Sequence, residues 1–192
     1  MSFLLSLLLL AAPIKTEQGR FNIVKDGQKI GTEEFSITKR ETHYLIDGKA
    51  TIGELTISSK MELDEKLSPV SYEASSPQGK IRVTVSPTFS ELQTIANGET
   101  TTDDFRFPAG GVILDNNFFH HYIVLLYRAQ LGLSNFAIVV PQDMSVGSAV
   151  VKSTGTRAYS LQIGDVQMQA TTDMEGRLVK LTVPAANVVV ER

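Results

Sequence analysis

Alternating apolar and polar residues run through most of the chain and predict β-strands. In the stretch from Ile81 to Val85, isoleucine and valine occupy every second position. A period of two places these side chains on one face of a strand. Similar runs recur roughly every 8–12 residues with turn residues between them, which is typical of an all-β domain with antiparallel strands. The sequence therefore predicts a mainly β fold.

Short turn motifs and changes of phase divide this pattern into strands. Asp26-Gly27, Asn97-Gly98 and Gly164-Asp165 have the residue types of two-residue hairpin turns. The alternation changes phase near Gly31, which predicts a β-bulge, and again near Gly53, which predicts a bulge or a turn. The continuous apolar run 136–140 indicates a strand that is covered on both faces.

The stretch 115–132 has a different period and predicts the one long helix, near residues 116–131. Asp115, Asn116 and Asn117 are suitable N-cap residues, and Gly132 favours a left-handed cap at the other end. Seven side chains fill one broad apolar arc at about 100° per residue, namely Phe118, Phe119, Tyr122, Ile123, Leu125, Leu126 and Ala129. The polar arc holds His120, His121, Tyr127 and Arg128.

Even the polar arc of this helix contains apolar residues, so the helix should be largely covered. We therefore expect a curved antiparallel sheet, a half-barrel or open barrel, wrapped around one central α-helix. The polar arc should then face the rim of the sheet or an opening. The 192 residues suffice for one domain with a substantial core. We assign residues 19–192 to a single β domain and residues 1–18 to a separate N-terminal segment.

The N-terminal segment predicts the compartment. Residues 3–12 are apolar apart from Ser6. Ten helical residues reach only about 15 Å, half of a bilayer core, so we expect no stable membrane span. The run is typical of the apolar region of a secretory signal, and a buried N-terminal strand or helix is the alternative. We expect an exported protein, periplasmic or secreted.

Composition narrows the function classes. The absence of cysteine excludes disulfides, a cysteine nucleophile and thiolate zinc sites. The net charge of −3 provides no basic field for nucleic acid, and the absence of tryptophan argues against a base-stacking platform.

Polar side chains in the sequence suggest no catalytic or metal site. Side chains of adjacent residues on a helix point about 100° apart, so His120 and His121 cannot chelate a metal alone and would need Asp115 or His43 as further ligands. We interpret them as imidazoles on the helix surface. No G-x-S-x-G motif accompanies them.

Two acidic pairs and one glycine pair have equally ordinary interpretations. Neighbours on a strand face opposite sides, so Asp103-Asp104 and Glu33-Glu34 are expected on solvated strand faces rather than as dyads. Gly110-Gly111 precedes the helix but lacks the companion residues of a phosphate-binding loop. We predict no catalytic residue, no cofactor and no metal, and hence a protein that is not an enzyme.

Four passages carry a family resemblance: FNIVKDGQKIGTEEF at 21–35, LDNNFFHHYIVLL at 114–126, FAIVVPQ at 136–142 and EGRLVKLTVPAANVVVER at 175–192. Together they resemble uncharacterised exported bacterial families described as domains of unknown function. The resemblance implies a periplasmic or cell-envelope β domain. Its architecture is similar to the half-barrel of lipoprotein-carrier proteins, which hold acyl chains between sheet and helix. It implies no activity and no catalytic residues.

These observations lead to three hypotheses. The first is a non-enzymatic envelope protein that binds or carries an apolar or lipid-like ligand between sheet and helix. The second is an envelope scaffold whose protein partner docks on the sheet edge or the polar arc, and the third is a hydrolase. The candidate apolar residues, which would otherwise form a solid core, are Phe105, Phe107, Phe118, Phe119, Tyr122, Leu126 and Phe136.

Overall fold

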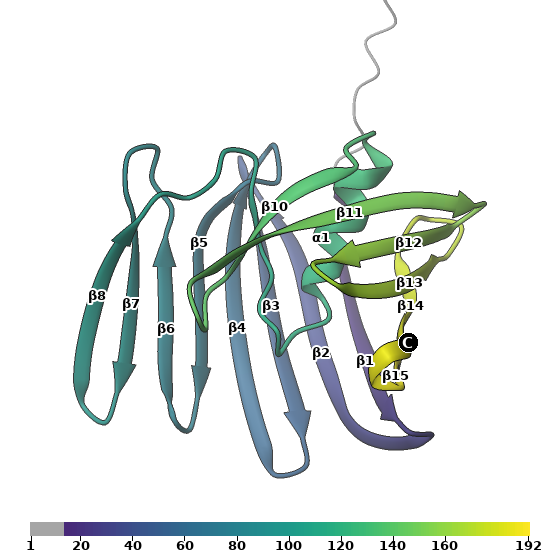
Figure 1. Cartoon of the computed structure of the whole chain (residues 1–192), viewed down its shortest axis with the longest axis horizontal. Helices are drawn as coiled ribbons and strands as arrows, with labels where there is room; N and C mark the ends of the chain where they lie inside the picture. Colours follow the sequence, from purple (N-terminus) through teal and green to yellow (C-terminus); the bar gives the residue numbers. More distant parts are fainter. Residues whose placement is uncertain (1–13) are drawn as a thin grey trace, which may run out of the picture.

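The computed structural model describes residues 14–192, so the predicted signal segment at residues 3–12 lies outside the described part of the chain. The described residues form one sheet of 15 strands and a single α-helix (Figure 1). The prediction of a mainly β fold with one helix is therefore confirmed.

The strands form two meanders that are joined through the helix. The first meander comprises β1 (Glu17–Lys25), β2 (Gln28–Arg40), β3 (His43–Ile52), β4 (Leu55–Asp64), β5 (Pro69–Ser76), β6 (Gly79–Thr84), β7 (Ser90–Ala96) and β8 (Glu99–Phe105). The short β9 (Val112–Ile113) and helix α1 (His121–Gln130) follow. The second meander comprises β10 (Asn135–Val140), β11 (Ser145–Gly155), β12 (Ala158–Ile163), β13 (Val166–Thr172), β14 (Leu178–Val183) and β15 (Val188–Glu191), with a 3-10 turn at Pro184–Ala186.

The first and last strands join the two meanders into one sheet. Strands β1 and β15 pair antiparallel, with Ile23 opposite Val190. All other neighbours are also antiparallel except β9, which runs parallel to β10 at one edge. Strand β8 forms the opposite edge, so the sheet is open.

Local turn predictions agree with the structure. Asp26 and Gly27 have φ values of 50° and 77°. Positive φ at both positions is required in the two-residue hairpin turns whose twist matches that of the flanking strands. Ile23 pairs with Gly31 but Val24 pairs with Lys29, so the predicted bulge lies in β2. Gly53 takes the turn alternative, between β3 and β4.

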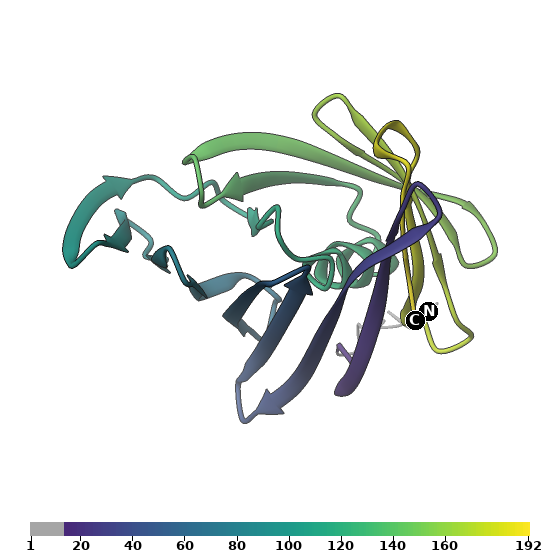
Figure 2. The same ribbon diagram turned by 90° about the horizontal axis from the view of Figure 1, so that it is seen from below.

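The sheet surrounds the helix. Figure 2 shows α1 between the strands of the first meander on one side and β10 and β11 on the other. One apolar core accordingly combines Met61 of β4, Leu125 of α1, and Ile138 and Leu161 of the second meander. Burial on several sides, rather than helix propensity, therefore stabilises this short helix.

The folded unit begins earlier than the predicted boundary at residue 19. Ile14 is buried in the main core, and β1 begins at Glu17, which is also buried. The Glu17 carboxylate accepts a hydrogen bond from the Arg192 guanidinium at 2.8 Å. Residues 14–18 thus belong to the domain, because both ends of the described chain meet at the β1–β15 junction.

The helix is shorter than predicted at its N-terminal end. Asp115 does not cap it: its carboxylate accepts from the Asn117 amide at 2.8 Å and forms a local turn. The predicted left-handed cap at the C-terminal end of the helix is confirmed, because Gly132 has a φ of 89°. The Gly132 amide donates to the Ala129 carbonyl, and the Leu133 amide donates to the Arg128 carbonyl.

Candidate functional site

A layer of polar side chains lies buried at the N-terminal end of α1. We predicted His120 and His121 on the helix surface and Glu33 on a solvated strand face, and all three are at most 1% exposed. The histidine prediction was wrong because it assumed that one arc of the helix reaches solvent, whereas strands lie on opposite sides of the helix (Figure 2). The Glu33 prediction was wrong because this side chain is on the inner face of β2, towards the helix. Asp115 and Ser59 are buried in the same region.

Glu33 holds the chain where it enters the helix. From β2, its carboxylate accepts the backbone amides of Phe119 at 2.8 Å and His120 at 2.7 Å, and the His120 Nδ1–H at 2.7 Å. A carboxylate is favourable here because the amides at a helix N-terminus lack partners and carry partial positive charge. These three hydrogen bonds explain how a fully buried acid is tolerated.

His120 lies against the inner face of the sheet. Its Nε2 faces the Ser59 hydroxyl at 3.4 Å, and its ring packs directly on Gly48. A Cβ at Gly48 would lie 2.1 Å from the His120 Cε1 atom. When the His120 ring carries a single proton on Nδ1, directed at Glu33, its Nε2 is the acceptor for the Ser59 hydroxyl.

A second buried group centres on Asp115. Its carboxylate accepts the Tyr72 hydroxyl, and its backbone amide donates to His121 Nδ1 at 3.1 Å. Burial, followed by the negative charge of Asp115, raises the pKa of Tyr72 well above 10. Burial, with the neighbouring His120, lowers the pKa of His121 well below 6.5. His121 is therefore neutral, with its proton on Nε2, which has no hydrogen-bond partner among the described residues.

The other two residues of the predicted polar rim are also buried. The Arg128 guanidinium donates to the carbonyls of Gly110 at 2.9 Å and Gly111 at 3.3 Å, and it lies over the Phe136 ring. Burial lowers the Arg128 pKa and raises that of Tyr127. The predicted rim is thus internal, and the glycine pair holds an arginine through its carbonyls.

The predicted apolar residues do not form a single cluster. Phe118 packs with Ala50 and Ile57, apart from the main core. Two others, Leu126 and Phe136, lie within the main core. Packed against it and only partly buried are Phe105, Phe107, Phe119 and Tyr122. Burial raises the Tyr122 pKa to about 12.

A pocket of about 300 Å³ lies beside the buried polar layer. One row of paired residues crosses the inner face of β3 to β7, in the order Gly48, Ser59, Ala74, Ile81 and Thr94. His120 covers the first two residues of this row, and the last three line the pocket. The pocket is therefore the continuation of the His120 site along the sheet.

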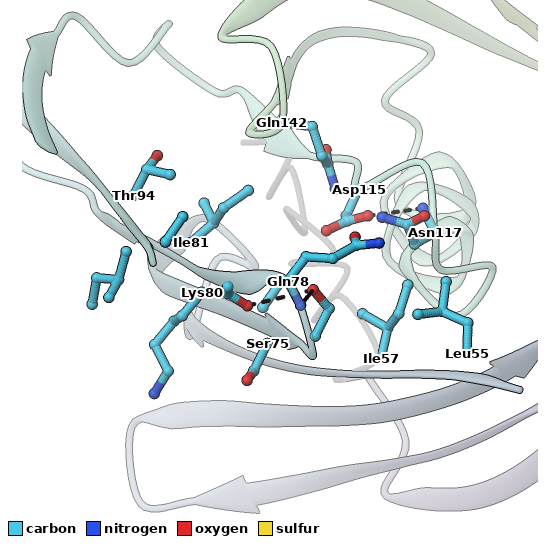
Figure 3. A pocket seen from close by; sticks show the side chains of 15 residues that line it. Leu55, Ile57, Ser75, Gln78, Lys80, Ile81, Thr94, Asp115, Asn117 and Gln142 are labelled. Carbon is cyan, nitrogen blue, oxygen red and sulfur yellow. Dashed lines mark hydrogen bonds between the residues drawn. The ribbon is translucent and has the colours of Figure 1, made fainter. Parts of the chain in front are cut away.

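Apolar and polar residues line different parts of this pocket (Figure 3). Leu55, Ile57 and Ile81 provide apolar surface from β4 and β6. Asp115 and Gln142 approach from the opposite side, and Figure 3 shows both side chains directed towards the pocket. Of the residues singled out in the sequence as polar or capping groups, Asp115 and Asn117 line it; both were named as helix caps, and Asp115 also as a metal partner.

A second pocket, of about 370 Å³, lies near the start of β5. Val70, Val85 and Phe107 line it together with Pro69 and Pro108. Phe107 is the one predicted apolar residue on its wall. Its lining includes no side chain of an acidic or basic residue, so it is less specific than the pocket at Asp115.

The remaining predicted residues lie outside this site. Asp103 and Asp104 are exposed on β8, as expected, and Glu34 makes only a long surface contact with Arg20. The His43 ring is hydrogen-bonded to its neighbour Thr42, and none of the hydrogen bonds found within residues 14–192 links it to His120 or His121. Within residues 14–192, no group of three or more acidic or histidine side chains is arranged to hold a metal ion, and no helix has the length and apolarity needed to cross a membrane.

Comparisons with known proteins identify no relative: no family model, curated protein or solved structure matches the chain. The geometry of the site is therefore the basis for assigning a function.

Sequence patterns could have placed some of the missed residues but not their partners. The alternation of β4 and β5 turns Ser59 and Tyr72 to the same side as Met61 and Ala74, which is the inner face. Their contacts with His120 and Asp115 depend on where the helix lies against the sheet. Local spacing does not encode that position.

Proposed function

We propose that this protein is a non-enzymatic cell-envelope protein that binds or carries a small, largely apolar ligand between the sheet and the segment leading into α1. The observation that carries the proposal is the pocket of about 300 Å³ between the inner face of β4 to β7 and the turn at Asp115. Export of the chain, suggested by its apolar N-terminal run, is part of the proposal.

The lining of the pocket supports ligand binding. Small-molecule sites are concave, mostly apolar and carry a few polar groups that orient the ligand. Here Leu55, Ile57 and Ile81 provide the apolar wall, and Asp115 and Gln142 provide polar groups opposite it. Because the Asp115 carboxylate is fixed by hydrogen bonds from the Tyr72 hydroxyl and the backbone amide of Asn117, the polar side of the pocket is preorganised.

Native mass spectrometry of protein purified from its source tests the proposal. We expect a bound mass that disappears when the same sample is extracted with organic solvent. Ala96→Phe should remove the bound mass, because Ala96 lines the pocket and a phenyl ring would fill it. Ala137→Phe is the matched control, since Ala137 is a half-buried residue of β10 outside the lining.

Ligand carriage would be contradicted if the parent protein had the mass of the chain alone and Ala96→Phe gave the same result. Protein capture would then favour the alternative of an envelope scaffold. Its accessible edge is β8, which is exposed from residue 99 to 104 and pairs on one side only.

A second candidate, a hydrolase, is favoured by one specific arrangement. Glu33, His120 and Ser59 are linked in the order acid, imidazole, hydroxyl, at 2.7 and 3.4 Å. This order is that of a nucleophilic serine with its base and orienting acid. Ser59 is directly opposite the pocket residue Ala74, so a substrate in the pocket would lie next to it.

Covalent labelling tests the hydrolase candidate. A fluorophosphonate probe should modify Ser59 in the native protein, and Ser59→Ala should abolish labelling. Ser90→Ala is the control, because Ser90 is another buried serine on β7, away from the imidazoles, with its hydroxyl near Ser86. If Ser59 in the folded protein is not labelled, the hydrogen bonds among Glu33, His120 and Ser59 serve to hold the start of α1 against the sheet and have no catalytic role.

A further inference from the structure

Asp115 is a buried carboxylate at the wall of the pocket, and its acceptor capacity is only partly used. It is 2% exposed and accepts two hydrogen bonds, from the Tyr72 hydroxyl and the Asn117 amide. A carboxylate offers about four lone-pair positions. Figure 3 shows that the carboxylate is directed into the pocket, so the unused positions face the space where a ligand would lie.

Among the described residues, no basic side chain is paired with this carboxylate. Among residues 14–192, no lysine, arginine or histidine nitrogen forms an ion pair with Asp115. Lys80 is the basic residue in the pocket lining, but its Nζ pairs with Glu73 at 2.9 Å and points away from Asp115 in Figure 3. Buried charges are usually paired, so a positive group on a ligand would complement this carboxylate.

We infer that the ligand is a small amphiphilic amine whose ammonium group binds Asp115 and whose hydrocarbon part lies on Ile57 and Ile81. The inference rests on the proposed function and specifies the class of its ligand. At about 30 Å³ per liquid water molecule, the pocket volume corresponds to a ligand of on the order of ten non-hydrogen atoms. Gln142 offers a further neutral acceptor on the same side.

Three alkyl compounds of equal chain length provide the test: n-octylammonium, n-octanol and n-octanoate. Calorimetry should show octylammonium binding at least about tenfold more tightly than octanol, as expected for a charge-assisted hydrogen bond. Octanoate should bind most weakly, because its charge repels Asp115. The methyl signals of Ile57, Ile81 and Ile95, which line the pocket, should shift in NMR spectra on binding.

Two variants isolate the carboxylate. Asp115→Asn keeps the size of the side chain and should bring octylammonium to within about twofold of octanol, since only the charge-assisted part is lost. Tyr72→Phe leaves the charge and removes one donor, so its preference for octylammonium should be retained. Asp104→Asn, which removes an exposed carboxylate on β8, controls for net charge and should behave as the parent protein.

The outcomes separate this inference from the proposed function. Equal binding of the three compounds, or an unchanged preference in folded Asp115→Asn, would overturn the amine assignment and leave ligand binding intact. A bound mass from the purified protein that lacks a basic nitrogen would do the same. If none of the compounds binds and the purified protein has no bound mass, the proposed function itself fails.

Discussion

His120 and Gly48 show how one contact constrains two distant positions of the chain. The imidazole lies on the backbone of β3, where any side chain larger than hydrogen would collide with it. Gly48 is in a regular strand, so a turn does not explain the glycine. The requirement is close approach of the His120 ring to the strand backbone.

Gly48→Ala should therefore destabilise the protein by about 1–3 kcal/mol, because the imidazole or the strand must move in a packed interior. Chemical denaturation measures the change. Gly155→Ala is the matched control in β11, where an added Cβ would meet Ala158 only at 3.9 Å. Equal stability of Gly48→Ala and the parent protein would show that His120 does not hold this position.

His121 makes stability depend on pH. Its pKa in the folded protein lies well below 6.5 because burial disfavours the charged ring. The unfolded chain binds a proton near pH 6.5, whereas the folded protein does not, so below this pH the unfolded state binds more protons. The contribution of neutral His121 to the free energy of unfolding should be fully present above pH 6.5. It should decrease as the pH falls from 6.5 towards the pKa of His121 in the folded protein.

Denaturation curves between pH 4 and pH 8 would measure this dependence. His121→Gln should be less stable near neutral pH, because it disturbs the acceptor for the Asp115 amide, but its stability should fall less steeply with acid. His43→Gln should keep the steep fall, since it leaves the buried histidine pair intact. An unchanged acid slope in His121→Gln would contradict the role assigned to His121.

The N-terminal end of α1 depends on a residue far away in sequence. Asp115, Asn116 and Asn117 have suitable side chains for a cap, but Asp115 closes a turn and Glu33 provides the carboxylate that accepts the amides of Phe119 and His120. Capping preferences are local and cannot identify an acceptor from another strand. The C-terminal end was predictable because Gly132 supplies its own left-handed conformation.

Glu33→Gln should destabilise the protein by about 2–4 kcal/mol, because it weakens three buried hydrogen bonds and leaves donors without a charged acceptor. The adjacent Glu34→Gln is the matched control, since that side chain is 63% exposed. Hydrogen exchange at the amides of Phe119 and His120 should accelerate in Glu33→Gln and remain slow in the control. Equal exchange in both variants would contradict the anchoring role.

Strand and turn patterns were sufficient for most of the fold, since they are local. The bulge beside Gly31 and the hairpin at Asp26-Gly27 follow from alternation and from residues that tolerate positive φ. The burial of His120 and His121 was not predictable, because it depends on sheet that reaches the helix from both sides. The same limitation hid the pocket, whose walls are joined only by tertiary packing.

The two meanders share one sheet and one core, so they should unfold together. Strands β1 and β15 pair at the junction, and buried residues of both meanders belong to the same apolar core as the helix. Neither meander can keep its inner face covered alone. A single cooperative transition is therefore expected for the described chain.

Leucine truncations on opposite sides of the junction test this expectation. Leu63→Ala in β4 and Leu181→Ala in β14 remove fully buried side chains and should each cost about 2–5 kcal/mol. Each substitution should lower the midpoint temperature of one common calorimetric transition. Each should also accelerate the slowest hydrogen exchange in both meanders, because exchange of the core amides requires global opening. If Leu63→Ala affected β2 to β5 alone and Leu181→Ala affected β12 to β14 alone, the junction would be a contact between two independent folding units. In that case a ligand in the pocket, which is lined mainly by the first meander, would stabilise only that meander.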